Sequence, residues 1–164
     1  MKIKFKLKIS KNDLLTTAPK ELARVTIEPH IQAIKSSVKE MIVEESKKMS
    51  KICGFSEHEC RLFIAKGMEK YFGAVADRAK QISYEILEGN FDANQCDEKE
   101  IEFVSKLVEK VGSIKEGVTM FLSFFQLQNN EELRNLLTKR TVEEVISLLS
   151  QIILETIKEM RYDG

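Results

Sequence analysis

The sequence predicts an all-α protein, a bundle of about six helices preceded by one short β-strand. Three observations support this fold class. After residue 12 the apolar residues recur at intervals of three and four, which places them on one face of a helix. Four capping boxes, each with a Ser, Thr or Asp three residues before a Glu, mark helix starts. Only two prolines and seven glycines interrupt the 164 residues, too few for a turn-rich β fold.

The first ten residues differ from the rest because charged and apolar residues alternate. Period two predicts a half-buried strand over residues 1–10, since a helix would scatter the same lysines around every face. The apolar side of this strand consists of Ile3, Phe5, Leu7 and Ile9, and its charged side of Lys2, Lys4, Lys6 and Lys8. A lone strand needs a partner for its backbone groups, so we expect it to pair with another chain or with a short extended piece of the bundle's loops.

Capping signals set the boundaries of the helices, which we expect to form a bundle over residues 17–162. Pro29 suits the first turn of a helix that Gly54, as a left-handed cap, is expected to end. Gly112 is expected to stop a later helix, after which Ser113 opens the next one. The expected helices span residues 17–27, 29–53, 56–88, 97–111, 113–127, 130–137 and 141–162.

Length and composition indicate a single globular domain over residues 1–164. Apolar residues make up 43% of the chain and charged residues 32%, which excludes a disordered chain and a membrane protein. Lys plus Arg (26) balances Asp plus Glu (26), so no global field demands nucleic acid or anionic lipid. Three cysteines without framework spacing, and the lack of a leader segment, predict a cytoplasmic, reduced protein.

The chain carries no catalytic motif: it lacks a Walker A loop, a dinucleotide fingerprint, a nucleophile elbow and a His-Glu-x-x-His helix. We therefore expect a non-enzymatic protein without a cofactor. Cys53, His58 and Cys60 are the candidate metal ligands, with Cys96 and His30 as remote ones, because thiolate and imidazole are the usual zinc set. The alternative is that the cysteines are small buried hydrophobes beside a helix cap, since the spacing is not that of a zinc knuckle.

The segment 113–127 is the most apolar part of the chain and is expected to form a helix that is apolar on nearly every side. Such a helix belongs at the centre of the monomer or of a subunit interface. We therefore expect a helical interaction or regulatory protein, a homodimer or a subunit of a larger complex. Its expected contact residues are the apolar side of the N-terminal strand together with Phe121, Phe124 and Phe125.

Two other functions stay open. A nucleic-acid-associated subunit would use the four N-terminal lysines, and it predicts that they share a face with a second basic group such as Lys47, Lys48 and Lys51. A bundle that binds a small apolar ligand would enclose it among the Met and Phe side chains. The candidate lining of such a cavity is Met68, Phe72, Met120, Phe121 and Phe124.

Overall fold

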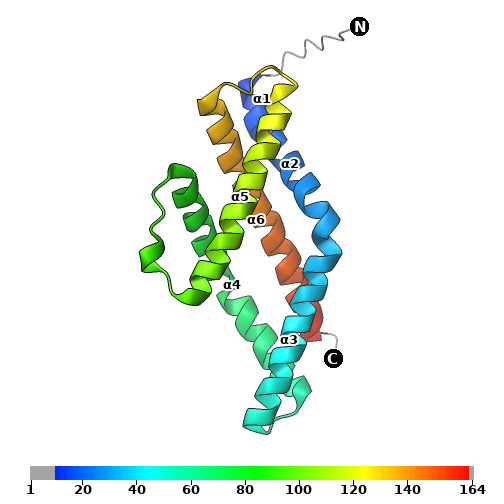
Figure 1. The fold of residues 1–164 in the computed structure, drawn as a ribbon. Coiled ribbons are helices and arrows are strands. Elements are labelled where there is room, and N and C mark those ends of the chain that lie inside the picture. Colours follow the sequence, from blue (N-terminus) through cyan, green and yellow to red (C-terminus); the bar gives the residue numbers. More distant parts are fainter. Residues whose placement is uncertain (1–9, 163–164) are drawn as a thin grey trace. The chain divides into compact units, whose positions relative to one another are not determined.

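The computed structural model describes residues 10–162, and for residues 95, 99, 100, 103 and 162 it describes the backbone alone. The described chain is helical and contains no strand, so the all-α class is confirmed (Figure 1). The strand predicted over residues 1–10 lies outside the described residues except for Ser10. The elements are α1 (Lys11–Thr16), α2 (Ala18–Ile27), η1 (Glu28–His30), α3 (Ile31–Cys53), α4 (Glu57–Glu88), η2 (Ala93–Gln95), α5 (Glu98–Ser123) and α6 (Glu131–Tyr162).

The predicted division into helices is wrong: α1 was not predicted, and two expected breaks do not occur. Helix α5 continues through Gly112, and α6 continues through Thr141. The hydroxyl groups expected to cap new helices bond backwards instead: Ser113 donates to the Glu109 carbonyl at 3.1 Å, and Thr141 to the Leu137 carbonyl at 2.7 Å. A hydroxyl that bonds the carbonyl four residues earlier is compatible with a continuous helix. The second half of the described chain therefore holds two long helices.

Other predicted helix ends are confirmed. Gly54 ends α3 with a φ of 77°, and Gly89 follows α4 with a φ of 73°, both in the left-handed region that favours glycine. The Ser56 hydroxyl accepts the Glu59 N–H at 3.1 Å, as the capping box requires. These ends depend on neighbouring residues only, which is why the sequence identifies them.

The chain divides into two compact units. The first contains residues 10–26 and 79–146 of the described chain, and the second contains residues 27–78 and 147–162. Helices α4 and α6 each contribute a segment to both units. The single domain expected from the sequence stays a prediction. None of the helices in the described residues combines the length and the hydropathy that a membrane span requires.

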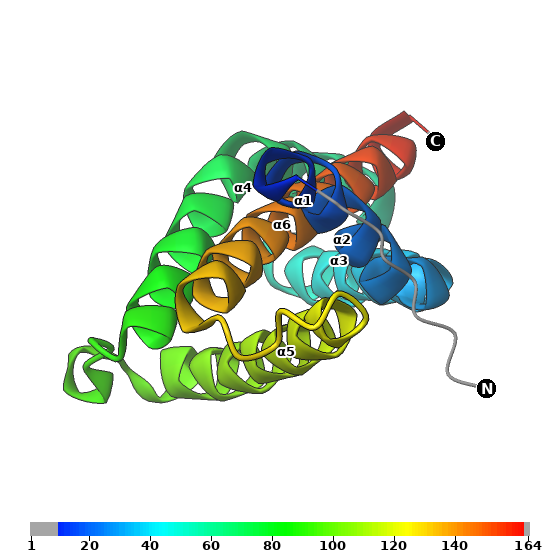
Figure 2. The same ribbon diagram turned by 90° about the horizontal axis from the view of Figure 1, so that it is seen from above.

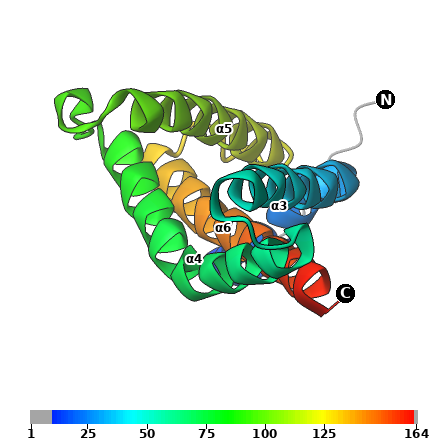
Figure 3. The ribbon, with the colours of Figure 1, turned by 90° about the horizontal axis from the view of Figure 1, so that it is seen from below.

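Three helices build the core of the second unit: α3, the first part of α4 and the last part of α6 (Figure 3). Ile42, Ala65 and Ile157 are each 0% exposed and belong to one apolar cluster, one from each helix. Ile64, Met68, Ile153 and Met160 pack around them. Two ion pairs join the same helices at the surface, Arg161 to Glu69 at 2.9 Å and Lys39 to Glu159 at 3.4 Å.

The core of the first unit draws on one face of α5 and on the first half of α6. The two helices run in opposite directions in Figure 1, and Figure 2 shows them from above. Val111, Val118 and Leu122 of α5 are nearly or completely buried, whereas Met120 is 67% exposed and Phe124, just after the helix, is 73% exposed. The expectation that this segment is apolar on nearly every side and belongs at a centre is therefore corrected. Within the first unit it is an amphipathic helix with two large apolar side chains facing solvent.

The turn after α5 contains a strained residue. Gln126 has a φ of 59°, the left-handed region that a non-glycine residue rarely adopts. The Leu127 N–H donates to the Leu122 carbonyl at 3.0 Å and the Gln126 N–H to the Ser123 carbonyl at 3.1 Å, the two bonds of a Schellman motif. Glycine usually occupies the position that Gln126 holds here.

We expect Gln126→Gly to stabilise the protein by about 0.5–1 kcal/mol, because glycine removes the steric cost of the left-handed conformation. Urea unfolding monitored by circular dichroism measures this change. Gln128→Gly, in the same turn but not at the left-handed position, serves as the control and is expected to destabilise. A lower unfolding midpoint for Gln126→Gly would show that the side chain contributes more than the strain costs.

Candidate functional site

A row of apolar side chains faces solvent along α4 in the second unit. Phe63 is 66% exposed and Tyr71 is 64% exposed, with Gly67 and Ala74 on the same side of the helix. At 3.6 residues per turn these four positions fall within an arc of about 80°. We call this surface, formed by Phe63, Gly67, Tyr71 and Ala74, the α4 stripe.

The α4 stripe borders the packed side of the same helix. Ala65 is completely buried in the core of the second unit, and Ile64 and Met68 pack against that core. Val75 is 56% exposed and extends the stripe at one edge. Helix α4 therefore has one apolar side that is packed and a second that no described residue of its unit covers.

Charged residues lie beside and at the end of the stripe. Lys66 and Lys70 are exposed on one flank, and Asp77 is exposed on the same flank about two to three turns later. The Lys70 ammonium lies 5.5 Å from the centroid of the Tyr71 ring, a cation–π contact. Arg78 is exposed near the C-terminal end of the stripe. Both signs of charge are thus available to a partner along one helix face.

The phenylalanines predicted as contact residues divide into two kinds. The rings of Phe121 and Phe125 pack edge to face, with centroids 5.3 Å apart, and both are partly buried. Phe124 is 73% exposed. Only Phe124 therefore offers most of its ring to a partner, while the four apolar residues of the predicted strand lie outside the described part of the chain.

The side chains proposed to enclose an apolar ligand do not share one environment. Met68 packs against the core of the second unit, whereas Met120 and Phe124 are mostly exposed in the first unit. An apolar pocket of about 440 Å³ lies elsewhere in the first unit, where residues of α5 including Ile101, Val104 and Val108 meet Phe91 and Cys96. None of its lining residues was predicted from the sequence as a ligand contact.

The three candidate metal ligands at the α3–α4 junction lie in different environments. Cys53 is exposed, Cys60 is buried, and His58 Nδ1 lies 3.0 Å from a guanidinium nitrogen of Arg61. Burial raises the pKa of the Cys60 thiol, and Cys53, Glu59 and Glu57 raise that pKa further. Within the described residues no three His, Cys, Asp or Glu side chains are placed to hold a metal ion.

The basic residues proposed for nucleic acid are only partly described. Lys47, Lys48 and Lys51 are exposed on α3, and Lys48 pairs with Glu45 at 3.4 Å. The N-terminal lysines Lys2, Lys4, Lys6 and Lys8 lie outside the described residues. Whether the two groups share a face therefore stays a prediction.

A polar contact that the sequence did not suggest joins α4 and α6 inside the first unit. The Tyr84 hydroxyl bonds to the Glu143 carboxylate, and the Lys139 ammonium lies 4.9 Å from the centroid of the Tyr84 ring. Burial, followed by the Glu143 hydrogen bond and charge, raises the pKa of Tyr84 to about 12. The contact keeps the phenol neutral and ties the two helices together.

We expect Cys53 to react with iodoacetamide much faster than Cys60, because Cys53 is exposed while burial both shields Cys60 and lowers its thiolate fraction. Mass spectrometry of peptides from briefly alkylated native protein measures the two rates. Alkylation in urea, where both thiols are accessible, provides the reference. Equal native rates would contradict the packing of Cys60 at the start of α4.

The Tyr84–Glu143 hydrogen bond predicts that the stability of the folded protein depends on pH in the alkaline range. Because the folded-state pKa is raised above 10, the stabilisation is fully present below pH 10 and is lost as the pH rises through 12. We expect the difference in urea midpoint between the wild type and Tyr84→Phe to shrink across this range. Lysine titration affects both proteins and cancels in the difference. Glu143→Gln should lower the Tyr84 pKa, as measured by tyrosinate absorbance, and an unchanged pKa would disprove the contact.

Comparisons of the chain with known protein families, with curated proteins and with solved structures found no match. The functional argument therefore depends on the chain's own residues. The feature with the largest exposed apolar side chains on one helix face is the α4 stripe.

Proposed function

We propose that the chain is a non-enzymatic helical interaction protein that works as a homodimer, with two copies of α4 packed antiparallel along the α4 stripe. The observation that supports this proposal is the exposure of Phe63 and Tyr71, at 66% and 64%, on a helix whose other side is already packed. Large aromatic side chains in a row at helical spacing are costly to leave in water. A second helix is the natural cover for such a row.

A second copy fits the stripe because the stripe is complementary to itself. When the two-fold axis passes between residues 70 and 71, Gly67 of one copy lies opposite Ala74 of the other. These two small side chains allow the helix backbones to approach closely. Because the interface is symmetric, the contact between Gly67 and Ala74 occurs twice, once on each side of the two-fold axis.

The large residues also find partners in this register. Phe63 lies opposite Arg78 of the second copy, where the guanidinium can stack on the ring. The two copies of Tyr71 lie on the same flank of the pair, on either side of the two-fold axis, where their rings can pack against each other. Lys66 comes within about one helical turn of Asp77 of the second copy, which places opposite charges at the edge of the interface.

The size of the stripe limits the affinity. One helix face from residue 63 to residue 78 is about 24 Å long, and a pair of such faces buries less than a standard interface of about 1,600 Å². We therefore expect a reversible dimer with a Kd in the micromolar range. The N-terminal strand and Phe124 are further candidate contacts, and the cytoplasmic location expected from the free cysteines stays a prediction.

Gly67 provides a direct test. A Cβ added at Gly67 or at Gly73 meets no atom within 4 Å, so both positions accept a larger side chain in the monomer. We expect Gly67→Leu to weaken dimerisation by at least about tenfold, because leucine prevents the close approach of the two helices. Gly73→Leu, on another side of the same helix, is the matched control and should leave dimerisation unchanged.

Multi-angle light scattering over a range of concentrations measures the dimer fraction of each protein. Both substitutions should raise the unfolding midpoint, since each replaces a helical glycine with a residue of higher helix propensity, a gain of about 0.5–1 kcal/mol. A dimer that persists in Gly67→Leu would show that another surface is the interface. A wild type that stays monomeric at all concentrations would overturn the homodimer itself.

A further inference from the structure

An apolar pocket of about 440 Å³ lies in the first unit, where the turn after α4 meets the first three turns of α5. Its lining includes Phe91 from the turn and Ile101, Val104 and Val108 from α5. Ile101 is 46% exposed and Val108 is 47% exposed, although both side chains are large and apolar. We call residues 85–109, which contain this pocket, the α4–α5 corner.

The α4–α5 corner carries the acidic excess of the first unit. Residues 10–26 and 79–146 contain 15 acidic and 11 basic residues, whereas the second unit, residues 27–78 and 147–164, contains 11 of each. The corner alone contains eight acidic residues and only two lysines. The charge balance of the whole chain therefore conceals one strongly acidic segment.

Three exposed glutamates form a line on α5 beside the pocket. Glu98, Glu102 and Glu109 fall within an arc of about 40°, and this line lies about 60–100° around the helix from Ile101. Glu102 pairs with Lys106 at 3.7 Å, an exposed ion pair of the kind that contributes little. The corner thus offers an apolar pocket with a negative border.

The first nine residues of the chain have the complementary character. They contain four lysines, no acidic residue and, alternating with the lysines, the apolar residues Ile3, Phe5, Leu7 and Ile9. The four lysines equal in number the acidic excess of the first unit. An extended segment of this pattern can place its apolar side on the pocket, while the long lysine stems bend toward the line of glutamates.

We propose that the α4–α5 corner binds residues 1–9 of a second copy of the chain. The segment of the same chain does not fit, because α1 lies at the other end of α5 (Figure 1). The distance along α5 from Val104 to the end of the helix is about 28 Å, and nine extended residues span at most about 30 Å. Only the first of these residues could therefore reach the pocket of their own chain.

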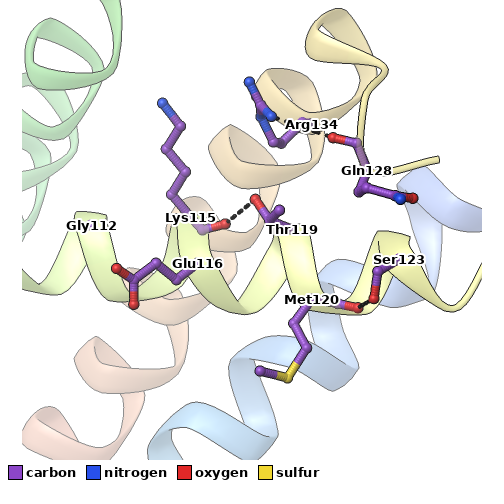
Figure 4. A pocket seen from close by; sticks show the side chains of 8 residues that line it. All are labelled: Gly112, Lys115, Glu116, Thr119, Met120, Ser123, Gln128 and Arg134. Atoms are coloured by element: carbon purple, nitrogen blue, oxygen red, sulfur yellow. Dashed lines mark hydrogen bonds between the residues drawn. The ribbon is translucent and has the colours of Figure 1, made fainter. Parts of the chain in front are cut away.

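A second depression, of about 710 Å³, lies further along α5, but its charge does not suit this segment (Figure 4). Lys115 and Arg134 line it. In Figure 4 both lie on one side of α5, whereas Glu116 is directed to a different side. The lysines of the segment would be repelled there, so electrostatics direct the segment to the α4–α5 corner.

This contact is independent of the pairing of α4. It is also weaker, because a single short segment with exposed charge pairs buries little surface. We therefore expect it at protein concentrations above those at which α4 pairs, where it links copies of the chain into larger assemblies.

A synthetic peptide of residues 1–10 with a fluorophore at its C-terminus tests the site, and fluorescence anisotropy measures its binding to the full chain. We expect Glu102→Lys with Glu109→Lys to weaken binding at least about tenfold, because two attractive charges become repulsive. Glu40→Lys with Glu44→Lys is the matched control. These exposed glutamates of α3 give the same change in net charge away from the corner, and binding should stay within about twofold of the wild type.

The apolar part of the contact and its alternation are tested with the same measurement. Ile101→Gln with Val108→Gln should weaken binding at least about fivefold, since the apolar side of the peptide loses its partners. A peptide of the same composition, with its lysines and apolar residues in two separate blocks, should bind less tightly than the natural one. Equal binding of the natural peptide to the wild type and to the Glu102→Lys, Glu109→Lys chain would overturn the proposal.

Mixing two full-length variants tests whether the segment comes from a second copy. One variant carries Lys4→Glu and Lys6→Glu, the other carries Glu102→Lys and Glu109→Lys, and both carry Gly67→Leu so that α4 pairing does not contribute. Each variant alone sets like charges against each other, whereas in the mixture each segment meets a site of opposite charge on the other variant. We expect sedimentation velocity to show association in the mixture and not in either variant alone. A mixture that sediments like its separate components would overturn the proposal, whatever the outcome for the homodimer.

Discussion

The second unit depends on the mutual burial of Ile42, Ala65 and Ile157, one side chain from each of three helices and all completely buried. The small side chain of Ala65 lets α4 approach its neighbours closely, and this contact fixes the rotation of α4 about its own axis. The Arg161–Glu69 ion pair lies partly in solvent, so its contribution is smaller than that of the apolar cluster. The rotation set by Ala65 decides which residues of α4 remain exposed.

That constraint connects the core to the proposed function. With Ala65 inward, Phe63 and Tyr71 face outward, and Gly67 lies between them on the same side of the helix. A glycine inside a long helix, such as the partly buried Gly67, lowers the stability of the helix by up to about 1 kcal/mol relative to alanine. Close pairing of two α4 helices gives Gly67 a physical role that the monomer does not show.

Local signals predicted the fold class and several helix ends, but they failed where two local interactions compete. Gly54, Ser56 and Gly89 were identified because cap geometry depends on adjacent residues. Ser113 and Thr141 have the same cap pattern, yet their hydroxyls bond the preceding turn and the helices continue. The sequence did not indicate the α4 stripe, because Ile64, Ala65 and Met68 form a more continuous apolar side on the same helix.

The most direct test of the antiparallel pairing is disulfide formation between two mixed variants. One variant carries Gly67→Cys and the other Ala74→Cys, and both carry Cys53→Ser and Cys96→Ser. The account predicts a cross-linked dimer in the mixture and little in either variant alone, because identical positions are offset by about 10 Å along the axis, too far for a disulfide. Cross-linking of Gly67→Cys with itself would indicate parallel helices. The absence of any cross-link, under conditions where light scattering shows a dimer, would contradict the claim that α4 forms the interface.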